Sequence, residues 1–167
     1  KGQYSPTSEL GKKTKSSPLG TIERPIWPVR TALASQATFV ARTIDADPMH
    51  LAETVEAAAR HRGTSFVEIL QNCRQVTVSP PNFTLANRAS REETRIVLEH
   101  DKPIRFGVGG RKGLQVRRME PKVVDLDEPG MDVEDTLIHN AKAVSPALAE
   151  MLAALMPPDF PMAFGVF

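Results

Sequence analysis

Cysteine is nearly absent from this sequence, with one residue in 167, and no long apolar run is present. One cysteine cannot form a disulfide within the chain, and a membrane-spanning helix needs about 20 apolar residues in succession. An excess of either charge is also missing, because 21 Lys and Arg residues stand against 20 Asp and Glu residues. The composition therefore excludes a disulfide scaffold and predicts a protein of the reducing cytoplasm that binds neither nucleic acid nor membranes.

Motifs for hydrolysis and for a complete metal site are missing as well. The chain contains neither G-x-S-x-G nor H-E-x-x-H, and its four histidines lack the spacing of metal ligands. A zinc or iron–sulfur centre needs about four ligands, and only one thiolate is present. Cys73 is therefore most simply a small buried apolar residue, and a cluster bound to it would take its other ligands from elsewhere.

What is present is an alternation of helices and strands in the first half of the chain. Pro28 is typical of a first helical position, and Asp47 before Pro48 is the start signal of a longer helix. The patterns predict, in order, a helix over 28–36, a strand over 38–41, a helix between Asp47 and Gly63, and a strand over 65–70. This order is typical of an α/β protein with a parallel sheet. Two strands do not complete such a sheet, so we expect its other strands after Cys73 or outside this sequence.

The pattern changes after Cys73, where prolines and asparagines mark irregular chain, so we predict a boundary between residues 1–73 and 74–167. The terminal run is interpreted as a strand or tail that docks on an apolar surface, which could belong to another chain. The glycine turn at residues 108–112 fits the spacing of neither phosphate-loop motif, G-x-x-x-x-G-K-[ST] or G-x-G-x-x-G. Beyond the boundary the sequence predicts a short helix over 91–98 and two strands over 104–107 and 113–116, joined by the glycine turn. A third strand over 122–126, a helix over 145–156 and the terminal strand over 162–167 follow.

Residues 1–25 are rich in Gly, Pro, Ser, Thr and Lys and lack hydrophobic periodicity, so they predict an extended loop. Lysines interleaved with serine and glycine suit contact with phosphate oxygens through ammonium groups and free backbone amides. A solvated polar loop is the alternative interpretation of the same composition.

Several blocks of this sequence, in the same order, resemble the thiamine-diphosphate-binding β subunit of the 2-oxoacid:ferredoxin oxidoreductases. Ordered blocks at family spacing are more specific than any single motif. The 2-oxoglutarate type is the most similar, and the resemblance continues more loosely to Phe164-Gly165-Val166. The main blocks are Lys1-Gly2-Gln3-Tyr4-Ser5-Pro6-Thr7-Ser8, Ala37-Thr38-Phe39-Val40-Ala41-Arg42, His61-Arg62-Gly63, Phe66-Val67-Glu68-Ile69 and Gln71-Asn72-Cys73.

The resemblance implies an α/β fold that is part of a thiamine-diphosphate-binding parallel sheet. Residues 1–73 would be the carboxy-terminal half of the thiamine-diphosphate-binding domain, and residues 74–167 a carboxy-terminal extension. The implied enzyme oxidatively decarboxylates a 2-oxoacid, most simply 2-oxoglutarate, transfers the acyl group to coenzyme A and reduces ferredoxin. The implied cofactors are thiamine diphosphate, Mg²⁺ and a [4Fe-4S] cluster, and the implied partner subunit is the α subunit of the same enzyme.

By the same resemblance, Cys73 is a ligand of the cluster, and Lys1, Gly2 and Gln3 lie beside the diphosphate and the magnesium ion. The family's amino-terminal half, with its magnesium ligands and three further cluster cysteines, is absent from this sequence. We therefore expect a carboxy-terminal fragment, or one piece of a split subunit, that binds neither metal nor cluster alone. The alternatives are a pyruvate or branched-chain 2-oxoacid enzyme, and a non-catalytic interaction module derived from the family.

Overall fold

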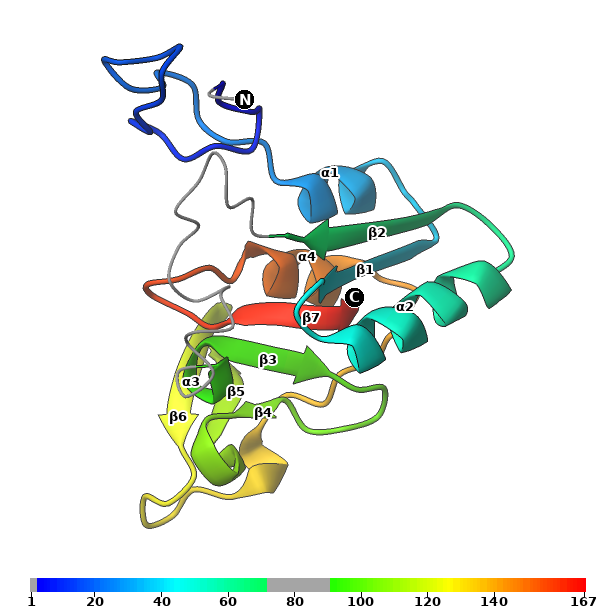
Figure 1. Cartoon of the computed structure of the whole chain (residues 1–167). Coiled ribbons are helices and arrows are strands. Elements are labelled where there is room, and N and C mark those ends of the chain that lie inside the picture. The colour runs from blue at the N-terminus through cyan, green and yellow to red at the C-terminus, as the bar shows by residue number, and fades with distance from the viewer. Residues whose placement is uncertain (1–2, 72–90) are drawn as a thin grey trace.

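The computed structural model describes residues 3–71 and 91–167. These residues form a four-stranded sheet in the order β2-β1-β7-β3 and a three-stranded sheet in the order β4-β5-β6 (Figure 1). The helices are α1 (Pro28–Ala34), α2 (Pro48–Arg60), α3 (Arg91–Thr94) and α4 (Ala147–Ala154), with short 3₁₀ turns η3 (Val108–Gly110) and η4 (Val133–Asp135). The strands are β1 (Phe39–Ile44), β2 (Ser65–Leu70), β3 (Arg95–Leu98), β4 (Arg105–Phe106), β5 (Lys112–Arg117), β6 (Glu120–Asp125) and β7 (Met162–Val166).

The four-stranded sheet is built from two parallel pairs of strands. β1 runs parallel to β2, and β3 runs parallel to β7. β7 is antiparallel to β1 and thereby joins the two pairs into one mixed sheet. The predicted α/β class is confirmed, and the additional strands that β1 and β2 need are supplied by segments after Cys73.

Most of the other predicted elements are present with shifted ends. Pro28 begins α1, and Asp47 caps α2 by accepting a hydrogen bond from the His50 backbone N–H. The two strands around the glycine turn are β4 and β5, which pair antiparallel, so this turn is a hairpin connection and not a strand-to-helix phosphate loop. The predicted third strand and last helix correspond to β6 and α4.

The prediction of a helix over 91–98 is wrong in its second half. Only Arg91–Thr94 is helical, and Arg95–Leu98 is strand β3. Ile96 and Leu98 point into the core while Val97 between them is 44% exposed, which is the two-residue period of a strand. Pairing with β7 therefore overrides the local helical pattern.

The terminal run docks on this chain's own sheet, so the interpretation that it could dock on another chain is wrong. β7 lies between β1 and β3, and its Ala163 and Phe164 are buried. Beyond its end, the Phe167 backbone N–H donates to the Val40 carbonyl at 2.9 Å. A strand this central has both faces covered, which explains why the run is apolar throughout.

Helices cover both faces of the sheet. α1 and α4 pack against each other on one face, over a core that includes Val29, Val40, Ile96 and Leu152. α2 covers β1 and β2 on the other face (Figure 1). None of the helices in the described ranges is both long and apolar enough to cross a membrane.

The predicted apolar face of α2 is only partly correct. Leu51 and Ala58 are half-buried, but Val55 is 45% exposed and Ala52 and Ala59 are exposed. The most buried side chain of the helix is Thr54, whose hydroxyl donates to the His50 carbonyl at 2.6 Å. A polar residue can face the sheet because its hydroxyl is satisfied within the helix itself.

A buried ion pair ties three strands together. Arg42 Nε on β1 lies 2.6 Å from Glu68 Oε2 on β2, and the two side chains are 4% and 15% exposed. The Nη1 atom of the same arginine donates to the Ala163 carbonyl of β7 at 3.2 Å. Arg42 therefore connects β2, β1 and β7 on one face of the sheet.

The Gly165→Ala substitution is expected to lower the free energy of unfolding by about 2–4 kcal/mol, because it adds a steric clash to an unfavourable φ. Gly165 has a φ of +109°, and a Cβ there would lie 2.8 Å from the Leu98 carbonyl oxygen of β3. Gly130→Ala is the matched control, with a φ of +84° and nothing within 4 Å of the added carbon. Urea denaturation measures both variants, and equal losses would contradict the predicted clash.

Candidate functional site

The carboxyl ends of β1 and β2 lie at one edge of the sheet, and this edge is the candidate place for a ligand site. Both strands run in the same direction, β1 leads into the Asp47 cap of α2, and β2 ends at Leu70. β7 is antiparallel to β1, so β7 and β3 begin at this same edge (Figure 1). Ligands of open α/β sheets collect beyond the carboxyl ends of the parallel strands.

Of the predicted site residues, only Gln3 lies within the described part of the chain. Lys1, Gly2 and Cys73 lie outside the described residues, so their predicted roles stay predictions. Gln3 is exposed and belongs to no helix or strand. The described residues therefore do not test whether the four predicted residues lie together, and the cofactor role of Gln3 stays a prediction.

The predicted extended loop is confirmed for residues 3–25, which contain only an isolated bridge between Thr14 and Ser17. Local hydrogen bonds shape it, including Gly11 N–H to the Thr21 carbonyl at 2.8 Å. Lys12 is paired with Glu9 at 3.2 Å. This pair reduces the positive charge that the loop offers to an anion.

A metal site does not arise from the described residues. Within 3–71 and 91–167, no group of three or more His, Cys, Asp or Glu side chains is placed to hold a metal ion. The described residues therefore do not supply by themselves the four ligands that an iron–sulfur cluster needs.

The structure does assemble a polar cluster at the carboxyl edge, which we call the edge cluster: Thr43, Asp47, His50 and Arg95. The Asp47 carboxylate accepts from the His50 backbone N–H at 3.3 Å and from Arg95 Nη1 at 3.2 Å. The side chain of Arg95 is 10% exposed, and its guanidinium lies 4.5 Å from the centroid of the Phe164 ring. The cluster links the start of α2 to the start of β3.

Burial and the Asp47–Arg95 pair shape the protonation of the edge cluster. Burial would raise the pKa of Asp47, but the His50 backbone N–H and the charge of Arg95 together lower it. Burial lowers the pKa of His50, and the nearby Arg95 charge lowers it further. A neutral His50 then pairs through Nδ1 with the Thr43 hydroxyl, 2.8 Å away. At neutral pH the cluster therefore holds one ion pair and one uncharged imidazole.

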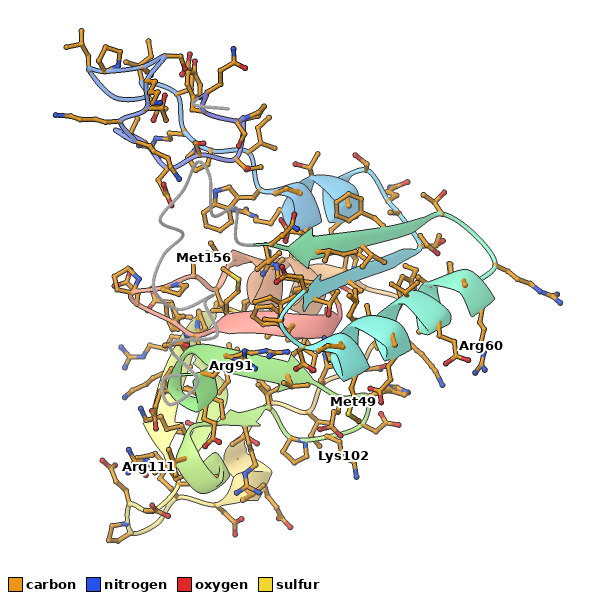
Figure 2. All side chains as sticks on the ribbon, in the orientation of Figure 1. Met49, Arg60, Arg91, Lys102, Arg111 and Met156 are labelled. Atoms are coloured by element: carbon orange, nitrogen blue, oxygen red, sulfur yellow. The ribbon has the colours of Figure 1, made fainter. Side chains whose placement is uncertain are left out.

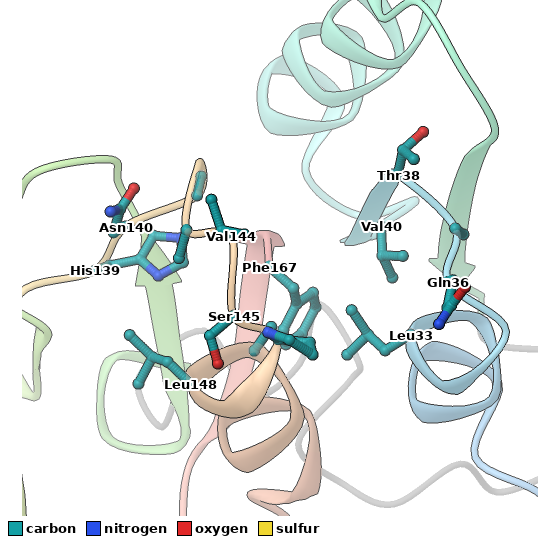
Figure 3. Close-up of a pocket in the computed structure, with 15 residues that line it drawn as sticks. Leu33, Gln36, Thr38, Val40, His139, Asn140, Val144, Ser145, Leu148 and Phe167 are labelled. Carbon is teal, nitrogen blue, oxygen red and sulfur yellow. The ribbon is translucent and has the colours of Figure 1, made fainter.

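A hollow of about 420 Å³ lies on the sheet face that α1 and α4 cover. Figure 3 shows His139 and Val144 on one side of it and Leu33 and Gln36 on the other, with Phe167 between them in this view. His139 is 1% exposed, and its Nε2 atom lies 2.7 Å from the Val166 carbonyl. Burial lowers the pKa of His139, so the ring is neutral at pH 7 and Nε2–H donates to that carbonyl. The lining of this hollow includes polar side chains such as Gln36, Asn140 and Ser145 but no charged side chain, which suits an uncharged occupant.

Sequence reasoning missed both Arg95 and His139. Arg95 was assigned to a helix, although the alternation after it in Arg95-Ile96-Val97-Leu98 is a strand signal. His139 is one of four histidines that stand far apart in the sequence, and nothing in its neighbours predicts complete burial. Both residues depend on β7, which packs against Arg95 through Phe164 and accepts from His139 through Val166.

We expect Asp47→Ala to lower the free energy of unfolding by about 1–3 kcal/mol, because it removes a helix cap and leaves Arg95 without its partner. Asp47→Asn keeps the capping oxygen and should recover about 1 kcal/mol of this loss. Glu56→Ala, which breaks the exposed pair with Arg60 on the same helix, is the control and should cost less than about 0.5 kcal/mol. Chemical denaturation measures all three, and an Asp47→Ala loss no larger than the control would contradict the cluster.

Stability should fall between about pH 7.5 and pH 5 because the folded state holds His50 and His139 with lowered pKa values. Over this range the unfolded chain binds more protons than the folded chain, so this stability is complete only well above the unfolded pKa of about 6.5 and is lost as pH falls from there through the folded pKa values. The melting temperature of His139→Gln should fall less over this range. A fall for His139→Gln as large as that of the wild type would exclude the contribution of His139.

No protein-family model matches the chain. Curated relatives do match. The chain is 39% identical over 162 residues to the 2-oxoglutarate oxidoreductase subunit KorB of Mycobacterium tuberculosis, covering 93% of this chain and 40% of the relative. It is 45% identical over 73 residues to the 2-oxoacid:ferredoxin oxidoreductase subunit beta of Saccharolobus solfataricus, covering 44% of this chain and 24% of that relative.

A solved structure shares the fold. It is the 2-oxoglutarate:ferredoxin oxidoreductase from Magnetococcus marinus with 2-oxoglutarate, coenzyme A and succinyl-CoA bound, which matches with a TM-score of 0.57 and 20% identity. The match covers 99% of this chain and 41% of that chain, and at this identity it supports the fold alone. The chain thus spans well under half the length of the proteins it matches. The similarity to the M. tuberculosis subunit extends over 93% of this chain, and from it we conclude that the chain belongs to the family of 2-oxoacid:ferredoxin oxidoreductase β subunits.

Proposed function

We propose that the chain is part of an enzyme that oxidatively decarboxylates a 2-oxoacid with coenzyme A and reduces ferredoxin. The observation that carries this proposal is the 39% identity to a KorB subunit over 93% of the chain. Because the chain covers 40% of that relative, the activity requires residues outside this sequence. The similarity of fold to a 2-oxoglutarate:ferredoxin oxidoreductase chain supports the same proposal.

We propose 2-oxoglutarate as the 2-oxoacid. The relatives from M. tuberculosis and from Archaeoglobus fulgidus are both named for 2-oxoglutarate, the second at 39% identity over 72 residues. The structural neighbour is titled with 2-oxoglutarate, coenzyme A and succinyl-CoA bound.

The proposed cofactors are thiamine diphosphate with Mg²⁺ and a [4Fe-4S] cluster, whose chemistry is decarboxylation and transfer of single electrons. Cys73 is proposed as a cluster ligand, and Lys1, Gly2 and Gln3 as neighbours of the diphosphate. The sequence supports this role, because strand β2 ends at Leu70, shortly before Cys73, and ligands of such sheets bind beyond the carboxyl ends of the strands. The remaining ligands must come from residues outside this chain.

The proposed partners are the rest of the β subunit, an α subunit and ferredoxin. Strand β2 supports the first of these, because among the described strands it is paired only with β1. Parallel strands are normally paired and covered, and an open edge attracts another strand. On the outer side of α2, Met49 is 75% exposed and Val55 is 45% exposed, as expected of a helix that another segment covers.

The Cys73→Ser substitution, made in the complete β subunit and assembled with its α subunit, tests the proposal. Loss of one thiolate should lower the iron content and abolish reduction of ferredoxin, while the far-ultraviolet circular dichroism stays unchanged. Ser65→Ala, at the opposite end of β2, is the control and should retain both iron and activity. Full iron content with normal ferredoxin reduction in Cys73→Ser would exclude Cys73 as a ligand.

A further inference from the structure

The guanidinium of Arg95 has an unused binding edge. Its Nη1 atom donates to Asp47, but Nε and Nη2 are both buried and have no hydrogen-bond partner in the described structure. Nε–H and one Nη2–H point in the same direction and form the fork that binds the two oxygens of a carboxylate or phosphate. Asp47 therefore neutralises Arg95 without occupying the fork.

A second arginine shares this situation. Arg91 precedes Arg95 by four residues, and its Nη2 atom is also buried and has no partner among the residues that the structure describes. Buried N–H donors are rarely left unpaired, because each unpaired donor loses the hydrogen bonds that it makes with water in the unfolded chain. Three unpaired donors on two neighbouring guanidinium groups indicate that acceptor oxygens are missing from this place.

Both arginines line a hollow of about 530 Å³, which we call the basic pocket. It lies beside β3, on the sheet face that α2 leaves open, where Val97 is 44% exposed. Figure 2 labels Arg91, on the short helix α3 that leads into β3, and Lys102, on the loop after β3. A volume of this size is ample for a phosphate group or a small dicarboxylate.

Positive charge predominates in the basic pocket. Its charged lining residues are Arg91, Arg95, Lys102 and Arg105 against Glu92 and Glu99. Neither of these carboxylates pairs with the Arg95 fork. The neighbouring Glu93 is already engaged, since its carboxylate contacts Lys112 Nζ and the Val108 backbone N–H.

We propose that the basic pocket binds a small oxyanion, a carboxylate or phosphate group, through the Nε/Nη2 fork of Arg95, with Arg91 and Lys102 as further cationic contacts. The fork supplies directional recognition, and Lys102 supplies charge at the pocket rim. The site is distinct from the proposed roles of Cys73 and of residues 1–3, and it does not depend on the proposed function. Filling the fork satisfies donors that the described chain leaves unpaired, so binding stabilises the folded state.

Thermal denaturation of the purified 167-residue protein with inorganic phosphate, and separately with succinate, tests this site at constant ionic strength. At least one of the two anions should raise the melting temperature in a saturable way, because a ligand that binds only the folded state stabilises it. Isothermal titration calorimetry then gives the dissociation constant and a stoichiometry of one. The anion that binds more tightly identifies the group that the pocket recognises.

Three variants separate the fork from general charge. Arg95→Lys keeps the charge but lacks the fork, and should weaken binding by about tenfold or more. Lys102→Gln changes an exposed side chain and should leave the fold intact. It should weaken binding by about two- to fivefold. Arg60→Gln, on the exposed side of α2, is the control and should leave the dissociation constant unchanged.

Two results would overturn the proposal. One is the absence of saturable binding of either anion up to about 50 mM in the wild-type protein, which would mean that any dissociation constant is larger than about 50 mM. The other is equal binding in the wild type, Lys102→Gln and Arg60→Gln, which would show association away from the pocket. Because Lys102→Gln preserves the core, this second result decides the matter even if Arg95→Lys does not fold.

Discussion

The central position of β7 is the constraint on which the rest of the structure depends. This strand pairs with β1 on one side and β3 on the other, so it joins segments that are far apart in the sequence. The hydrogen bond from Arg42 to the Ala163 carbonyl, for example, closes a separation of 121 positions. An isolated pair of strands is marginal in water, and the parallel pairs β1–β2 and β3–β7 become one covered sheet only through this strand. Gly165 permits the required approach, because any side chain there would meet the Leu98 carbonyl.

The same pairing places the polar groups at the carboxyl edge. Since β3 is parallel to β7 and β7 is antiparallel to β1, β3 begins where β1 ends. Arg95 thereby meets Asp47, and the ring of Phe164 on β7 supports its guanidinium. Completion of the sheet and assembly of the edge cluster are therefore one structural event. A cation this well buried persists because one edge is paired with a carboxylate and its face lies on an aromatic ring.

The shape of the molecule agrees with membership of a family whose members are longer. Among the described strands, β2 has one unpaired edge, and α2 exposes apolar side chains. These features suit an element that completes its surface with residues outside this sequence. The basic pocket lies beside β3, at the opposite side of the sheet from β2, and its described lining comes from this chain. The proposed division at residue 73 stays a prediction, while strands from both sides of it share one sheet.

The sequence by itself determined those features that depend on neighbouring residues. Asp47 and Pro48 start α2, Pro28 starts α1, and the hairpin around the glycine turn follows from local chemistry. The family was also evident from ordered motifs. Only the tertiary structure decided that Arg95–Leu98 is a strand, that β7 lies in the middle of the sheet, and that Arg95 and His139 are buried. The physical reason is that strand pairing and the burial of a charged or polar group depend on partners distant in sequence, whereas helix caps and turns satisfy their hydrogen bonds within a few residues.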